Sequence, residues 1–204
     1  NYYYFCNLKI QTMSKAQFTH LHVHSQYSLL DGKASIPELV DKAIADGMHG
    51  IALTDHGNMF GIKEFFNYVE KVNGKLPDDS KFKPIFGCEM YVARNKMTDK
   101  KDKTDNGYHL IVLAKNEKGY HNLCKLVSHS WTEGYYYKPR TDREDLAAHR
   151  EGLIVSSACL GGEVPQFIMH DELEKAEERI LWYKETFGDD YYIELQRHQT
   201  FKEN

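Results

Sequence analysis

Side chains of the kinds that coordinate metals stand at the ends of this chain's short apolar segments, and that placement constrains the fold more than any other feature. The seven residues are His22, His24, Asp31, His56, Glu89, His109 and Cys159. Each lies just before, within or soon after an apolar run typical of a buried strand. Nitrogen, oxygen and sulfur ligands from five successive strands can converge only if those strands lie side by side with their functional ends together. The sequence therefore predicts a multinuclear metal site on a barrel-like sheet.

The apolar pattern alternates between strands and amphipathic helices. Strands are predicted at residues 18–23, 51–54, 84–92, 108–113, 153–156 and 191–195, and helical stripes at 36–44, 62–72, 120–131 and 173–187. Ser35 and Glu38 form a capping box at the start of the first helix. Residues 95–106 and 132–142 are interpreted as irregular surface segments. Repeated strand–helix units predict an α/β fold with parallel strands, right-handed crossovers and one domain.

The composition is that of an ordinary globular protein, with 41% hydrophobic and 27% charged residues. A net charge of −4 argues against a general nucleic-acid clamp, because phosphate binding needs clustered Lys and Arg. No apolar run approaches the ~20 residues of a membrane span. The four cysteines show no tight pairing pattern, which favours a reducing, cytoplasmic location. Residues 1–12 are interpreted as a non-native or mis-called leader, so we expect the domain over residues 13–204.

Several of the candidate ligands have ordinary alternatives. The pattern His20-x-His22-x-His24 also suits a polar strand face. Because residues two apart on a strand differ by ~6.5 Å along it, we expect His22 and His24 near the metal and His20 below them. Asp31 precedes glycine, as in a simple turn, and His109 precedes four apolar residues, as a buried core histidine would. These alternatives remain open at the level of sequence.

The remaining candidates differ in how strongly their surroundings argue for a role. Glu89 lies in an apolar strand, where a carboxylate is costly unless it is paired or bound to metal, and as a bridging ligand it could hold two cations. Cys159 could instead be a small buried cysteine, although its position just past a strand favours coordination. In the polar segment that follows strand 51–54, His56 is the predicted ligand and Asp55 is expected to orient a ligand from behind.

Read in order, these residues resemble the PHP (polymerase and histidinol phosphatase) family. The strings that carry the resemblance are FTHLHVHS at 18–25, YSLLDG at 27–32, ALTDHGN at 52–58, KPIFGCE at 83–89, YHL at 108–110, GYHNL at 119–123 and EGLIVSSACLGG at 151–162. The likeness runs from about residue 18 to the last residue. Within the family it is strongest to the domains at the N-terminus of the alpha subunits of bacterial replicative DNA polymerases.

The resemblance implies a distorted (βα)7 TIM-like barrel with up to three metal ions at its strand ends. It implies that all seven candidates are ligands and that Glu89 bridges. The family pattern also includes a late Asp-x-His from a seventh strand. The sequence ends at Asn204 before such a motif, so we expect a C-terminally incomplete domain that is weakly active or inactive alone.

Neighbouring cations can lower the pKa of a bound water and clamp the oxygens of a phosphodiester. The expected cofactors are Zn²⁺, Mn²⁺ or Fe²⁺, because imidazole, carboxylate and thiolate together disfavour Mg²⁺ alone. The resemblance implies removal of a 3′-terminal nucleotide from DNA, with the rest of the polymerase chain and replisome subunits as partners and no catalytic residue beyond the ligands. Arg94, Lys138 and Arg140 are candidates for substrate phosphates, with ordinary solvated charges as the alternative. A stand-alone phosphatase for a small monoester such as histidinol phosphate, or a metal-stabilised docking module, is the alternative function.

Overall fold

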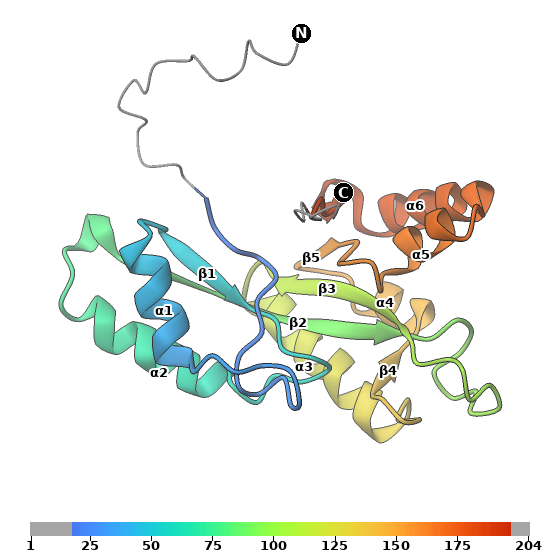
Figure 1. Cartoon of the computed structure of the whole chain (residues 1–204), viewed down its shortest axis with the longest axis horizontal. Coiled ribbons are helices and arrows are strands. Elements are labelled where there is room, and N and C mark those ends of the chain that lie inside the picture. Colours follow the sequence, from blue (N-terminus) through green and yellow to red (C-terminus); the bar gives the residue numbers. More distant parts are fainter. Residues whose placement is uncertain (1–17, 197–204) are drawn as a thin grey trace, which may run out of the picture.

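A computed structural model describes residues 18–196 (Figure 1). The leader predicted at residues 1–12 lies outside the described residues. The helices are α1 Ile36–Ala45, α2 Ile62–Asn73, α3 Glu117–Thr132, α4 Arg143–Ala148, α5 Glu163–Met169 and α6 Leu173–Phe187. The strands are β1 Gly50–Leu53, β2 Lys83–Val92, β3 Tyr108–Ala114, β4 Arg140–Thr141, β5 Leu153–Ser156 and β6 Tyr191–Tyr192, and the 3₁₀ turns are η1 Asp78–Ser80 and η2 Gly188–Asp190. The chain has a mixed α/β fold.

The four helices predicted from apolar stripes are confirmed as α1, α2, α3 and α6. The capping box is present: the Ser35 hydroxyl accepts from the Glu38 N–H, and the Glu38 carboxylate accepts from the Ser35 N–H. The short helices α4 and α5 were not predicted, because six or seven residues hold too little of a 3.6-residue period to be recognised. In Figure 1, α1 and α2 lie near β1, while α5 and α6 lie at the other end of the molecule.

The six-stranded sheet has the order β1-β2-β3-β5-β6, with β4 beside β2. β2 pairs in parallel with β1 and with β4, and β5 pairs in parallel with β6. β3 is antiparallel to both of its neighbours, β2 and β5. The prediction of parallel strands is therefore wrong for β3. Residues 93–107 join β2 to β3 without a helix, and such a loop returns the chain antiparallel, whereas a parallel return needs a crossover. The reversal also explains why the candidate His109 lies at the start of its strand and not at the end: the first residues of β3 lie beside the last residues of β2.

The strand predicted at 18–23 is also wrong, because the chain bends at residues 21–22 and forms no regular ladder. This segment nevertheless runs beside β1: Ala52 N–H donates to the His20 carbonyl at 2.8 Å and Thr54 N–H to the Val23 carbonyl at 2.9 Å. Between these two bonds the segment advances three residues while the chain of β1 advances two, so the backbones form no regular ladder. The Thr54 hydroxyl adds a further bond by accepting from the Val23 N–H at 2.8 Å.

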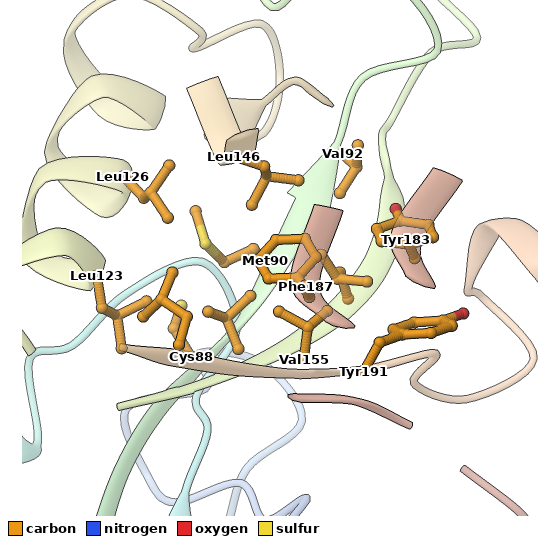
Figure 2. Close-up of a cluster of buried hydrophobic side chains, with 13 residues drawn as sticks. Cys88, Met90, Val92, Leu123, Leu126, Leu146, Val155, Tyr183, Phe187 and Tyr191 are labelled. Atoms are coloured by element: carbon orange, nitrogen blue, oxygen red, sulfur yellow. The ribbon is translucent and has the colours of Figure 1, made fainter. Parts of the chain in front are cut away.

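The two faces of the sheet have different roles. Cys88, Met90 and Val92 of β2 lie on the face that packs, with Val155 of β5, against α3, α4 and α6 (Figure 2). Strand side chains alternate between faces, so the intervening Glu89 is on the opposite face. The register pairs Glu89 with Ile111 and Tyr91 with His109, and Ile111 in turn with Ser156. Paired residues share a face, so the helix-free face carries the polar side chains of the site.

The sheet brings distant parts of the chain together at this face. His22, in the segment beside β1, has its Nδ1 2.9 Å from Oε1 of Glu194, which follows β6. The two ends of the strand order are thus joined through side chains. Within residues 18–196, no helix combines the length and apolarity needed to cross a membrane.

Candidate metal centre

Glu89 stands at the centre of the site, with a side chain only 1% exposed. Its Oε1 lies 3.4 Å from His22 Nε2 and 2.8 Å from His109 Nδ1. Its Oε2 lies 3.7 Å from His24 Nε2 and in close contact with His56 Nδ1. The two oxygens of one carboxylate therefore face different pairs of imidazoles, which is the arrangement expected of a carboxylate that bridges two cations.

The other two predicted ligands complete the cluster at its edges. The Cys159 thiol lies 3.4 Å from His109 Nδ1 and 3.9 Å from Glu89 Oε1. Asp31 is exposed and places Oδ2 2.8 Å from His56 Nε2. The structure thus brings all seven predicted residues into one pocket, whose lining also includes Gln196.

The backbone adopts uncommon conformations where it presents the predicted ligands Asp31 and Cys159 at the edges of the cluster. Leu30, directly before Asp31, has φ 80°, and Ala158, directly before Cys159, has φ 59°. Residues other than glycine rarely adopt this left-handed region, and such outliers gather at functional sites. Gly57, after the predicted ligand His56, has φ +60°, and a Cβ there would lie 2.7 Å from a proline side-chain carbon. A side chain at position 57 would therefore disturb the turn that carries the ligand.

Asp55 holds two predicted ligands, His24 and His56, in place through Ser28. The Ser28 hydroxyl donates to Asp55 Oδ1 at 2.8 Å and accepts from the His56 backbone N–H at 3.1 Å. His24 Nδ1 lies 2.8 Å from the same hydroxyl. Since the single hydroxyl hydrogen points to the carboxylate, His24 Nδ1 must carry a hydrogen and donate it. Its Nε2 then offers a lone pair toward Glu89, which is the tautomer that metal binding needs.

Glu194 plays the same part for His22, and sequence reasoning missed it. Its Oε1 accepts from His22 Nδ1, its Oε2 accepts from the Ser156 hydroxyl at 3.0 Å, and its own N–H donates to the Ser157 hydroxyl at 2.9 Å. His22 Nε2 is thereby turned toward Glu89. The available signal was an acidic residue in the predicted strand at 191–195, near the same strand ends as the other ligands.

The remaining predicted residues lie apart from the cluster. His20 is exposed, and its ring packs edge-on against Phe18 with centroids 4.9 Å apart. The Arg94 guanidinium is paired with Asp102 at 3.1 Å. Lys138 places its Nζ 4.2 Å from the ring centroid of Tyr91.

Arg140 corrects the sequence interpretation. Its side chain is fully buried, and its guanidinium donates to Asp105 Oδ2 at 3.0 Å and to the carbonyls of Met97 and Asp99 at 3.1 and 2.9 Å. A buried guanidinium needs acceptors for all its N–H donors. The donors of Arg140 bind acceptors in the 95–106 segment and so hold that segment in place. Arg140 cannot contact a substrate phosphate from this position.

Charges within the cluster are strongly coupled. Burial lowers the pKa of His22, but hydrogen bonds to Glu194 and Glu89 outweigh it and raise the pKa to about 10. Burial likewise lowers the pKa of His109, and its bonds to Cys159 and Glu89 raise it to about 9. Burial raises the pKa of Glu89, yet hydrogen bonds from the histidines hold it well below its usual range. The hydrogen bond with His109 lowers the pKa of the Cys159 thiol. The cluster thus favours protonated imidazoles at His22 and His109 beside the Glu89 carboxylate, whereas burial lowers the pKa of His24.

The same residues suit divalent cations. His22, His24 and Glu89 form one group, and Glu89, His109 and Cys159 a second, in each of which the ligand atoms lie within 4.8 Å of one another. His56 Nδ1 and Glu89 Oε2 are buried and lie against each other without forming a hydrogen bond that satisfies either atom among the described residues. Buried polar atoms normally have partners, and a cation held by both residues would supply one. Mixed nitrogen, oxygen and sulfur donors favour transition metals over Mg²⁺ alone.

Fold and site together define an α/β domain with a candidate multinuclear metal centre at its strand ends. The PHP domain family matches residues 20–198. The chain belongs to this family, as its sequence motifs predicted.

The relatives that the chain matches are much longer proteins. It is 50% identical over 186 residues to the DNA polymerase III subunit alpha of Borreliella burgdorferi, which covers 90% of this chain and 16% of the relative. It is 48% identical to that of Treponema pallidum, with 91% and 16% covered, and 46% identical to that of Chlamydia trachomatis, with 90% and 14% covered. A solved structure described as a metal-dependent phosphoesterase candidate from Bifidobacterium adolescentis aligns over 87% of this chain and 86% of its own at 14% identity and a TM-score of 0.46, a likeness too distant to carry an argument.

Proposed function

We propose that this chain is the PHP domain of a DNA polymerase III alpha subunit and that its metal centre hydrolyses phosphodiesters at the 3′ end of DNA. Identities of 46–50% to alpha subunits support the first part, although the chain spans only 14–16% of their length. This relationship favours a domain of a replicative polymerase over a stand-alone phosphatase for small monoesters. The rest of the polymerase chain and replisome subunits are the proposed partners, and the cytoplasm is the proposed location.

The observation that carries the hydrolytic part is the position of Glu89 between two groups of ligands. Bound Zn²⁺, Mn²⁺ or Fe²⁺ would supply an activated water and polarise phosphate oxygens. The chain's own contribution is to hold the ligands in the right tautomer and orientation. Ser28 does this for His24, and Glu194 for His22. We propose that all seven clustered residues are ligands and that no further side chain acts as the catalytic base.

Aromatic side chains near the site favour a nucleic-acid strand as substrate. Trp131 donates from Nε1 to the carbonyl of Gly57 at 2.8 Å, next to the ligand His56. Its exposed ring stacks on Tyr135 with centroids 5.5 Å apart and tilts against Phe60 at 6.2 Å. Exposed aromatic rings stack on unpaired bases without requiring a particular sequence. A small phosphate monoester would make no use of such a surface.

Lys138 is the basic candidate that remains for a substrate phosphate. Its ammonium lies over the Tyr91 ring, which packs against the His109 ring with centroids 5.2 Å apart. A positive charge here would attract the phosphate backbone locally. This suits a domain whose net charge of −4 gives no general affinity for nucleic acid.

We also propose that the six-stranded sheet is part of the distorted barrel expected of the family. The His22–Glu194 hydrogen bond, which joins the segment beside β1 to the segment after β6, supports this. So does the division between a helix-covered face and a face that carries the ligands.

The test uses the complete protein that contains this chain, loaded in turn with Zn²⁺, Mn²⁺ and Fe²⁺. A single-stranded oligonucleotide labelled at its 5′ end should lose 3′ nucleotides, and EDTA should stop the loss. Glu89→Gln should abolish this activity while nucleotide incorporation by the same protein continues, and exposed Glu185→Gln on α6 should change neither. No EDTA-sensitive shortening with any metal would refute the hydrolytic proposal and leave a metal-stabilised docking role. Faster hydrolysis of a small monoester than of DNA would favour the phosphatase alternative.

A further inference from the structure

A second group of metal-binding side chains lies outside the centre described above. His129 is in the last turn of α3, Asp145 is in α4, and His149 caps the C-terminal end of α4. Asp145 Oδ1 lies 3.0 Å from Nδ1 of each imidazole, and the three ligand atoms lie within 4.8 Å of one another. We propose that these residues form a separate site for one Zn²⁺ ion, sharing no ligand with the Glu89 cluster.

The spacing of the three atoms suits zinc. Tetrahedral Zn²⁺ with bonds of about 2.0–2.1 Å keeps neighbouring ligand atoms roughly 3.3–3.4 Å apart. The two separations from Asp145 Oδ1, each 3.0 Å, need to widen by only a few tenths of an ångström, and the two imidazole nitrogens lie within 4.8 Å of each other. Two imidazoles and one carboxylate are a donor set that zinc uses with a water as the fourth ligand. Both histidine side chains are partly exposed, at 34% and 20%, so water can reach the open position.

The surroundings hold the carboxylate ready. Asp145 is 8% exposed, and its Oδ2 accepts from the Thr141 hydroxyl at 3.3 Å, which leaves Oδ1 for a cation. Asp145 and His149 are four residues apart and therefore share one face of α4. His129 and His149 both stand at C-terminal helix ends, where the unpaired carbonyl groups favour a positive charge. Without metal, His149 Nδ1 donates to the Asp145 backbone carbonyl at 3.0 Å, and metal binding would exchange this bond for coordination.

The three residues flank the segment 133–139 in the sequence, which suggests what the bound ion would do. One ligand precedes the segment 133–139 and the other two follow it, so bound zinc would close that segment into a loop. The segment carries Tyr135, which stacks on Trp131, and Lys138, which lies over Tyr91 beside the metal-centre ligands. Metal that binds only the closed form stabilises it. The second site should therefore hold this loop in place beside the first centre.

The test measures zinc at the two places independently in the complete chain. Crystals of the wild-type chain soaked in Zn²⁺ should show an anomalous difference peak between His129, Asp145 and His149 at the zinc edge. By mass spectrometry, His149→Gln should carry about one zinc fewer than the wild type, whereas His121→Gln, an exposed histidine on α3, should carry the same number. Proteolysis within 133–139 should slow on zinc addition in the wild type and in the His121 variant only.

Two results would overturn the site: a wild-type map without the peak, or equal zinc content in the wild type and His149→Gln. In that case the three residues are a hydrogen-bonded link between α3 and α4. If His149→Gln fails to fold, which circular dichroism would reveal, the wild-type map alone decides. None of these measurements depends on phosphodiester hydrolysis, so the outcome is separate from that of the proposed function.

Discussion

Replacing Glu194 by Ala should weaken metal binding, although Glu194 itself is not a predicted ligand. Glu194 holds His22 in the tautomer whose Nε2 faces Glu89. With Ala, the His22 ring loses its partner and can rotate or carry its hydrogen on the wrong nitrogen. Glu194→Gln is the more conservative change, because the amide oxygen can still accept from His22 Nδ1 while the negative charge is gone.

The expected magnitude follows from the kind of contact that is lost. Removing the hydrogen-bond partner of a ligating histidine costs about 10–100-fold in metal affinity, or roughly 1.4–2.7 kcal/mol. A hydrogen bond to a charged group contributes about 1.5–3 kcal/mol, which agrees with this range. The Glu194 side chain is 19% exposed, so solvent screens the bond only partly. We expect the full loss in Glu194→Ala and a smaller loss in Glu194→Gln.

The assay is competitive titration of Zn²⁺ against a chromophoric chelator, with wild type, both Glu194 variants and Glu185→Gln as a control for the loss of one surface carboxylate. Circular dichroism confirms that each variant is folded. Unchanged zinc affinity in a folded Glu194→Ala protein would refute the orienting role, and an equal loss in Glu185→Gln would assign the effect to net charge.

Three further predictions follow from the site. His22→Ala should reduce bound metal, measured by mass spectrometry, while the exposed His20→Ala should not, and an equal loss in both would contradict the geometry. Because neighbouring carboxylates raise the pKa of His22 from 6.5 to about 10, their stabilisation of the metal-free protein is complete below pH 6.5 and is lost as the pH rises to about 10. Metal affinity should rise over the same pH range, because a ligating imidazole must lose its proton. The difference in Tm between zinc-loaded and EDTA-treated protein should therefore increase with pH. A constant difference would contradict this prediction. Lys138→Ala should raise the KM for an oligonucleotide more than it lowers kcat, and an unchanged KM would remove Lys138 from the substrate site.

That the seven residues lie in one pocket could be predicted from the sequence, because residue types that can bind metal recur at strand ends. His22, His56 and Cys159 each stand beside an apolar run, and packing of a hydrophobic core does not explain why these residue types occur at all three positions. The long helices were predictable for a related reason: stripes with a 3.6-residue period and a capping box are local signals. These helices are determined by local sequence and not by contacts with distant residues.

The features that the sequence did not predict correctly depend on contacts between residues far apart in the chain. The direction of β3 is set by a loop whose mixed charges carry no period, and nothing in residues 108–113 distinguishes an antiparallel strand from a parallel one. The buried Arg140 pairs with Asp105, which is 35 residues away in the chain. Glu194 meets His22 across 172 residues. Such side chains become visible only when the fold has placed them.

Cobalt titration of the wild-type chain, followed by its near-ultraviolet absorption, tests the central claim most directly. The Glu89 cluster contains a thiol, that of Cys159, whereas the His129–Asp145–His149 group contains none. We predict a thiolate-to-cobalt charge-transfer band that saturates with added Co²⁺ and disappears in Cys159→Ser. If no band forms in the wild type, or the same band forms in Cys159→Ser, then the seven clustered residues are not the metal centre that this account requires.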